Sequence, residues 1–407
     1  MKHAIVALFI ILSVFSASTM LGQVSSRNRL AKNGKTAMSQ IYVDPVHGDD
    51  TQAGTKARPC KTISAALSLL PEEVAADVTV HLKAGVYATT GGEGMPVDCL
   101  VLRRRMWPGV TVQIQREPDA KQGETKNGAV LDWGGREFLV LVLEGQWSLS
   151  NLQVGTRRLD QRQGVGVEGP GLAIVRDVRI RTTSRAQGAG LLARRAGRIE
   201  LYGTIEMNED LHDEREGEEN FCGIVAKDHG TVQFMQRDGA SLSIGNGQLA
   251  ASYYGCVRLG CAWARITSWT TGNNISVGNS GRVDLHGTET TLRGRHPDNC
   301  LIGPEDDGHI LAENTHVILE SLGCRDAIYL QKASKLFGGP FEVRGVFTNT
   351  VAAMSGSIFV GTVTGAVSHV EAHTGGHITL EHGSSMPKTA RGYMGGTVVL
   401  PNDEIRR

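Results

Sequence analysis

The sequence is poor in proline and has no excess charge of either sign. Its 407 residues include 12 prolines, and 42 basic residues balance 42 acidic ones to a formal net charge of zero. A neutral chain is not drawn in bulk to nucleic acid or to anionic membranes, so we expect neither as a partner. The seven cysteines contain no Cys-x-x-Cys spacing, which is the usual signature of a zinc site.

Glycine, in contrast, is abundant. The chain contains 51 glycines, roughly twice ordinary usage, and 40% of its residues are hydrophobic. Many glycines with few prolines indicate an ordered chain with many tight turns. The hydrophobic content is sufficient for a long core, so the chain need not divide into several domains.

One short pattern recurs six times, with glycine first and Val or Ile third. The copies are GRIEL at 197, GTVQF at 230, GRVDL at 281, GHILA at 308, GHITL at 376 and GTVVL at 396. Their intervals of 33, 51, 27, 68 and 20 residues fit one, two, one, two to three, and one coils of a repeated unit. Strands this short bury a face only by stacking on their neighbours, about 4.8 Å away. The pattern therefore predicts an all-β parallel solenoid with one continuous core, lined by Val232, Val283, Ile310, Ile378 and Val398.

The N-terminus has the layout of a secretory signal peptide. Lys2 is followed by an apolar stretch from Ala4 to Phe15 and then by small residues. We predict a secreted or cell-surface (periplasmic or extracellular) protein with no other membrane association, and retention of the apolar stretch as an anchor is the alternative. The expected divisions are a signal peptide (1–22), a flexible basic leader (23–40), a strand and helix (41–76), the solenoid (77–401) and a tail (402–407).

Two segments resemble known β-helical proteins. IYVDPVHGDDTQAGTKARPCKTISAALSLLP (41–71), with VTVHLKAGVYATT (78–90), resembles the start of right-handed parallel β-helix proteins of the pectin-lyase-like superfamily. Residues 356–401 resemble the closing coils of phage-tail β-helical proteins. The resemblance implies a right-handed parallel β-helix that interacts with carbohydrate. It is also compatible with an oligomer, for example a trimer.

The N-terminal residues support this fold independently. They predict a strand over 41–43, a turn over 48–50, and an apolar-faced helix over about 62–70 that would cover the open end of the solenoid. Asp49 and Asp50 in the turn either bind nearby backbone groups or hold a cation.

A basic stretch is the first candidate site. Residues 157–198 contain ten arginines and three acidic residues. Because guanidinium groups pair bidentately with carboxylates and sulfates, stacked arginines would suit an acidic polysaccharide, whereas acids on adjacent coils would make this an ordinary solvated face. In β-helical lyases an Arg or Lys base removes the proton next to a uronate carboxylate, and the resemblance extends that role to arginines here. We assign catalysis to Arg194 and Arg157, and substrate binding to Arg158, Arg195 and Arg162.

An acidic run is the second candidate. Residues 206–220 carry eight carboxylates and one arginine. Such a loop could bind Ca²⁺ through Glu209, Asp210 and Asp213, although the twelve-residue calcium-loop spacing is absent. The alternatives are a solvated acidic loop and an internal partner for the arginines, one coil away.

Three weaker patterns remain open. His369, Glu371 and His373 alternate along one predicted strand, so they share a face and either bind a transition metal or lie exposed by chance. Asp306 and Asp307 resemble the paired carboxylates of β-helical glycosidases only in being adjacent. Cys300 and Cys324 lie one coil apart and either stack inward as small apolar residues or form a disulfide.

Two functions follow from these patterns. One is an enzyme, a lyase that cleaves an acidic polysaccharide. The other is a non-catalytic β-helix that binds glycan or builds a surface or tail-like assembly. The fold alone does not decide between them.

Overall fold

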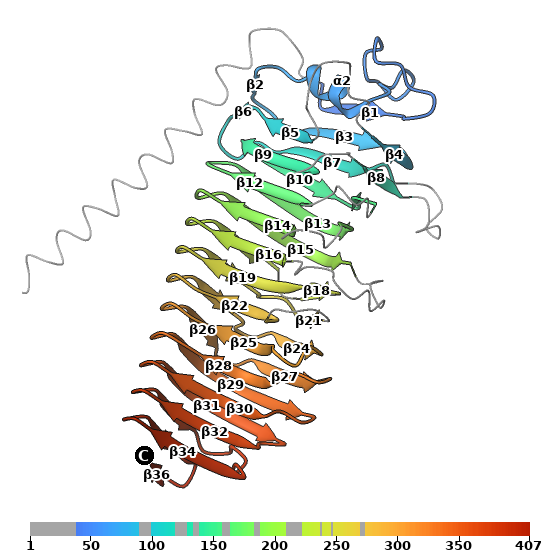
Figure 1. The fold of residues 1–407 in the computed structure, drawn as a ribbon. Coiled ribbons are helices and arrows are strands. Elements are labelled where there is room, and N and C mark those ends of the chain that lie inside the picture. Colours follow the sequence, from blue (N-terminus) through green and yellow to red (C-terminus); the bar gives the residue numbers. More distant parts are fainter. Residues whose placement is uncertain are drawn as a thin grey trace, which may run out of the picture. The chain divides into compact units, whose positions relative to one another are not determined.

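The chain is built from parallel β-strands, each paired with the strand one coil away in the sequence (Figure 1). The computed structural model describes residues 38–88, 99–118, 128–132, 138–156, 163–182, 188–208, 222–236, 238–245, 247–268 and 273–407. Residues 39–407 form one compact unit. Within the described ranges, no helix is long and apolar enough to cross a membrane. The prediction of an all-β parallel solenoid is confirmed.

Two long sheets make up the solenoid. The 12-stranded sheet contains β5 (Leu100–Arg103), β9 (Val140–Glu144), β12 (Val165–Glu168), β14 (Ala189–Arg194), β16 (Cys222–Lys227), β19 (Gln248–Ser252), β22 (Ile275–Val277), β25 (Cys300–Pro304), β28 (Asp326–Leu330), β30 (Asn349–Met354), β32 (His369–His373) and β34 (Thr389–Tyr393).

The 22-stranded sheet supplies one or two strands per coil. It contains β1 (Gln40–Val43), β3 (Val78–Leu82), β4 (Gly85–Tyr87), β7 (Val112–Arg116), β8 (Ala129–Leu131), β10 (Gln146–Ser150), β11 (Gln153–Val154), β13 (Leu172–Ile180), β15 (Arg198–Met207), β17 (Thr231–Phe234), β18 (Ser241–Ile244), β20 (Cys256–Arg258), β21 (Trp263–Ser268), β23 (Arg282–Asp284), β24 (Glu289–Gly294), β26 (His309–Ala312), β27 (His316–Ser321), β29 (Lys335–Arg344), β31 (Ile358–Gly365), β33 (His377–Leu380), β35 (Thr397–Val399) and β36 (Ile405–Arg406). The remaining elements are α2 (Ile63–Ser68) and a small sheet of β2 (Glu73–Val74) and β6 (Arg105–Met106).

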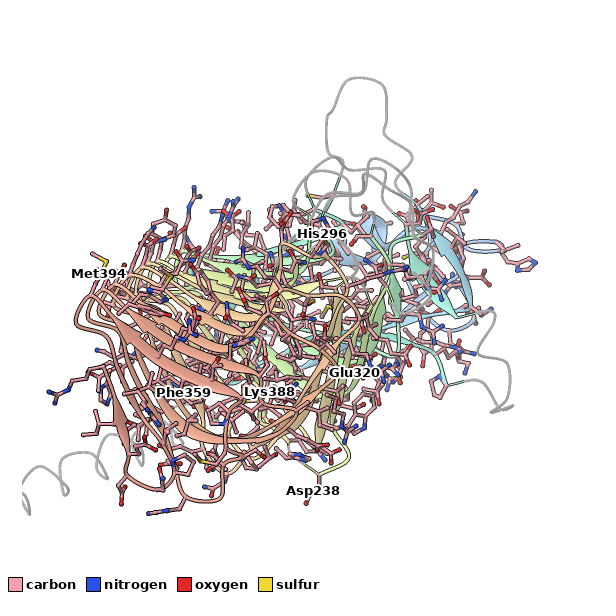
Figure 2. All side chains as sticks on the ribbon, turned by 60° about the horizontal axis from the view of Figure 1, so that its bottom comes forward. Asp238, His296, Glu320, Phe359, Lys388 and Met394 are labelled. Atoms are coloured by element: carbon pink, nitrogen blue, oxygen red, sulfur yellow. The ribbon has the colours of Figure 1, made fainter. Side chains whose placement is uncertain are left out.

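One column of side chains runs through the core from the first coil to the last. Its thirteen residues are Val78, Val112, Trp147, Ala173, Ile199, Val232, Val257, Val283, Ile310, Leu336, Phe359, Ile378 and Val398, each paired with the next across a parallel ladder. None is more than 1% exposed. The third position of every pentad therefore points inward, as predicted. Phe359, one residue of this column, is labelled in Figure 2.

The first position of the pentad is small because another coil passes close to it. A Cβ added to Gly281 would lie 2.3 Å from the carbonyl oxygen of Ala251 in the preceding coil, and one added to Gly255 would lie 2.1 Å from that of Ala226. In two coils serine takes this place. Ser334 Oγ donates to the Pro304 carbonyl at 3.0 Å, and Ser357 Oγ donates to the Met354 carbonyl at 2.6 Å. These serines divide the interval from 308 to 376 into three coils.

Many coils of the 22-stranded sheet also contain a bend that divides it into two faces. In three successive coils the bend residue has a left-handed backbone, with φ of 55° at Asn151, 51° at Asp177 and 65° at Gly203. At the far end, β36 pairs antiparallel with β35, which was not predicted from the sequence.

The N-terminal segment has the predicted strand, turn and helix. Thr62 caps α2 by accepting a hydrogen bond from the Ala65 N–H at 3.1 Å, and Ile63, Ala66 and Leu67 are buried in the common core. In the turn, Asp50 Oδ1 accepts from the N–H groups of Lys61 and Thr62, at 2.8 and 2.7 Å. Asp49 Oδ1 accepts from the Thr51 N–H at 2.9 Å, so both carboxylates bind nearby backbone.

Asp44 ties this segment to the first coil. Its side chain accepts a hydrogen bond from Lys83 Nζ at 2.7 Å and from the N–H groups of Val46 and His47, each at 3.0 Å. Burial disfavours the Asp44 charge, but these hydrogen bonds and the Lys83 charge outweigh burial and lower the pKa of Asp44 to about 2. The stabilisation is therefore complete above the unfolded-state pKa, about 3.9, and is lost as pH falls toward 2.

We expect Asp44→Asn to destabilise the protein by about 1–3 kcal/mol at pH 7, because it removes a charge-assisted hydrogen bond. The variant should also lose less stability than the parent between about pH 4 and 2. Urea unfolding at several pH values measures both effects. Lys83→Met should reproduce most of the loss, and the double variant should be little worse than either one. An equal loss of unfolding free energy below pH 4 in the variant and the parent would contradict this account.

Candidate functional site

The structure describes two of the arginines assigned to the basic site. Arg194 is the last residue of β14, and Arg195 follows in the turn with a φ of 53°. The other assigned residues, Arg157, Arg158, Arg162, Glu209, Asp210 and Asp213, lie outside the described residues.

Arg194 and Arg195 converge on one carboxylate. Arg194 Nε donates to Glu168 Oε1 at 2.5 Å, and Arg195 Nη1 donates to Glu168 Oε2 at 3.1 Å. Glu168 is on β12, directly opposite Arg194 in the parallel ladder. Both of these arginines therefore have a carboxylate partner on the adjacent coil. The left-handed turn at Arg195 brings its side chain to the same side as Arg194, and Glu168 neutralises part of their charge.

The described part of the basic stretch is compensated elsewhere too. Arg179 Nε lies 2.7 Å from Glu206 Oε2, and Arg198 Nη2 lies 2.8 Å from Glu200 Oε1. The Arg176 guanidinium lies over the Tyr202 ring, 4.5 Å from its centroid. Arginines of one coil thus contact acids or rings of the same or a neighbouring coil, as expected for a solvated face.

The weaker patterns form no metal site among the described residues. His369, Glu371 and His373 do share the outer face of β32, but His373 stacks on Tyr393 with ring centroids 4.6 Å apart and lies 3.3 Å from Glu371. Asp306 and Asp307 are both left-handed turn residues, with φ of 50° and 59°. Cys300 and Cys324 are buried free thiols, which confirms the inward interpretation over the disulfide.

A cleft lies along the bend of the 22-stranded sheet, with a volume of about 300 Å³. We call it the bend cleft. Its lining residues come from four successive coils: Arg116, Gly128, Val130, Asn151, Leu152, Gln153, Asp177, Val178, Arg179, Thr204 and Glu206. With coils about 4.8 Å apart, the cleft extends roughly 15 Å along the stack.

The bend shapes the floor of this cleft. Asp177 is left-handed, and its Oδ1 accepts a hydrogen bond from the Thr204 N–H at 2.9 Å. A Cβ on Gly203 would lie 2.1 Å from Asp177 Oδ1. Glycine at 203 therefore makes room for the carboxylate of the preceding coil. Aspartate and asparagine tolerate the left-handed region better than most residues, which explains Asp177 and Asn151 at the bend.

The bend cleft has balanced charge and many hydrogen-bonding groups. Arg116 and Arg179 offer donors, Asp177 and Glu206 offer acceptors, and Gln153 offers both. Glu206 is engaged by Arg179, and Asp177 by the Thr204 N–H. The arrangement suits an extended hydroxyl-rich ligand that exchanges hydrogen bonds with each coil in turn.

A second cleft, of about 380 Å³, is lined by Glu72, Arg103, Arg104, Arg105 and Glu144. Arg103 Nε lies 3.5 Å from Glu144 Oε2, and Arg104 donates to the carbonyl oxygens of Arg103 and Leu67 at 3.0 and 3.1 Å. Sequence reasoning missed this cleft, although three consecutive arginines were a visible signal. The bend cleft was not predicted as a site either, although Asp177 and Arg179 belong to the basic stretch and Glu206 begins the acidic run.

Comparison with known proteins finds one partial family match and two distant structural similarities. Residues 46–102 match a family model described as a protein of unknown function (DUF1565). No curated protein matches the chain. Two crystal structures of GH136 lacto-N-biosidase from Eubacterium ramulus are similar. The selenomethionine derivative is 12% identical with a TM-score of 0.40, covering 93% of this chain and 70% of that one. The native protein is 11% identical with a TM-score of 0.33, covering 89% and 67%. Similarity this low transfers no substrate and no site residue.

Proposed function

We propose that this protein binds an extended polysaccharide in the bend cleft. The observation that carries the proposal is a polar, charge-balanced cleft that crosses four stacked coils. A chain of sugar rings laid along the stack would meet a new set of donors and acceptors at each coil. Equal numbers of arginines and carboxylates in the lining favour recognition of hydroxyl groups over recognition of a polyanion.

Binding is better supported than lyase chemistry. A lyase base must accept a proton, and arginine does so only when its charge is suppressed. Arg194 instead donates a hydrogen bond to Glu168, so its guanidinium is already engaged as a donor. In the bend cleft both carboxylates already accept hydrogen bonds from N–H donors. We therefore propose a glycan-binding protein without lyase activity.

The wider setting belongs to the same proposal. The predicted signal peptide would deliver the protein to the cell surface or beyond, where polysaccharides are accessible. We propose that the coils wind to the right, as parallel crossovers almost always do. We also propose that α2 shields the first coil from water, since its apolar face is already part of the core.

We expect Arg179→Ala to weaken polysaccharide binding roughly ten-fold, because a charged hydrogen-bond donor contributes about 1.4 kcal/mol. Affinity electrophoresis against neutral and acidic polysaccharides gives the ligand, and calorimetry gives the dissociation constant. The matched control is Arg293→Ala. Arg293 and Glu320 form the same kind of pair at 2.7 Å, with side chains 42% and 29% exposed, against 43% and 29% for Arg179 and Glu206.

Two outcomes would overturn this proposal. One is an equal loss of binding in both variants, which would show that Arg179 acts only through general surface charge. The other is new absorbance near 235 nm with a uronate-containing polysaccharide, which would show unsaturated products and hence a lyase. Binding should also depend only mildly on salt, since the lining is balanced.

A further inference from the structure

A row of stacked turns joins the 12-stranded sheet to the 22-stranded sheet. In each of these turns two consecutive residues have positive φ, for example Asp228 and His229, Tyr253 and Tyr254, and Asn279 and Ser280. Successive turns are joined by backbone hydrogen bonds. The second residue of one turn donates its N–H to the carbonyl of the first residue of the next turn. Examples are His229 to Tyr253, at 3.1 Å, and Tyr254 to Asn279, at 3.3 Å. Equivalent turn residues are therefore aligned along the stack.

Tyr253 and Tyr254 are the one turn of this row, among the described residues, in which both positive-φ positions are aromatic; other turns of the row have Arg195, Lys332 or Met394 at the first position. The φ values of the two tyrosines are 49° and 62°, a region that is unfavourable for bulky side chains and suits Gly, Asn and Asp. They are also 54% and 64% exposed, so burial does not compensate for this strain.

Tyr254 presents one open ring face. Its other face stacks on His229, with centroids 5.1 Å apart and ring planes within 6°. Because His229 belongs to the preceding coil, the open face points toward the following coil, where the aligned residue is the small Ser280. One coil further, Asp307 Oδ2 lies 3.3 Å from Ser280 Oγ. Two coil spacings, about 10 Å, thus separate the aligned positions of Tyr254 and Asp307, and the aligned residue between them is Ser280. We call the position above Ser280, next to the Tyr254 ring, the shelf.

We propose that this shelf is a saccharide subsite that binds one pyranose ring. The C–H face of the sugar would stack on Tyr254 at about 4 Å, and its hydroxyls would reach Ser280, Asp307 and Asn279. An aromatic floor suits a glucose-like or galactose-like ring with a flat apolar face. The shelf is separate from the bend cleft and does not depend on glycan binding there.

The test compares the same substitution at two adjacent turn positions. Tyr254→Asn removes the platform and keeps a residue that tolerates the left-handed backbone, and Tyr253→Asn is the matched control. The probes are methyl β-glucopyranoside and methyl β-galactopyranoside, measured by saturation-transfer NMR and calorimetry. We expect at least ten-fold weaker binding for Tyr254→Asn and less than a two-fold change for Tyr253→Asn.

A second variant tests the shelf without touching the tyrosine. Ser280→Gln fills the open space and should also weaken binding at least ten-fold, whereas Tyr254→Phe should bind like the parent. No binding of either glycoside, or an equal loss with Tyr253→Asn, would overturn the proposal.

Discussion

We expect Val283→Asp to abolish folding. Val283 is fully buried in the middle of the core column, between Val257 and Ile310 of the adjacent coils. A carboxylate there would have no partner, and burying an unpaired charge costs several kcal/mol or more. Since a protein of this kind is stable by roughly 5–15 kcal/mol, the variant should be recovered as insoluble protein or as a partly unfolded chain. Circular dichroism and thermal unfolding measure the result.

The matched control moves the same charge to the outer face. Gln233→Asp places a carboxylate on β17, next to Val232 of the core column but on the opposite side of the strand. In the ladder Gln233 lies between Glu200 and Arg258, so the new carboxylate has one like and one opposite charge beside it, and Glu200 is itself held by Arg198. This variant should fold with nearly unchanged stability. A soluble, cooperatively unfolding Val283→Asp protein would contradict the assignment of the column as a closed core.

The second large effect is expected at the pentad glycines. Gly281→Ala should destabilise the protein by about 1–3 kcal/mol, because the added Cβ would lie 2.3 Å from the Ala251 carbonyl oxygen and one of the two coils must shift. Urea unfolding gives the free energy, and the slope of the transition shows whether the native fold is kept.

Gly278→Ala is the control in the same coil. Its nearest atoms would be 3.6 Å away, an ordinary contact, and neither Gly278 nor Gly281 has a positive φ. Any entropic advantage of alanine over glycine is similar at the two positions, so the difference between the variants reports close approach alone. Equal stabilities would mean that the coils are more loosely stacked than the structure shows.

These two predictions depend on residues that the sequence identified correctly. The glycine and the third-position aliphatic residue recur because every coil meets the same neighbours, so the requirement is repeated and becomes a visible pattern. Ser334 and Ser357 escaped notice because a search for glycine does not find a serine that satisfies the carbonyl with its hydroxyl.

The candidate sites were less accessible to sequence reasoning. The ten arginines of residues 157–198 were found, but their partners were not. Arg194 and Glu168 are 26 residues apart and meet only because they face each other in one ladder. The bend cleft depends on left-handed residues at Asn151, Asp177 and Gly203, which occur once per coil and leave no periodic hydrophobic signal.

The architecture of this protein follows from its amino-acid pattern alone: parallel strands, stacked coils, one core and the inward face of each pentad. This is possible because every coil must bury the same positions, so the same residue types recur in the sequence at intervals of one coil. Three features became visible in the folded chain alone. They are the pairing of the charged side chains, the bend cleft, and the stacking of the Tyr254 ring on His229. Those features depend on coil lengths and on single backbone angles. They bring together residues that are far apart in the sequence, and no local sequence pattern predicts such contacts.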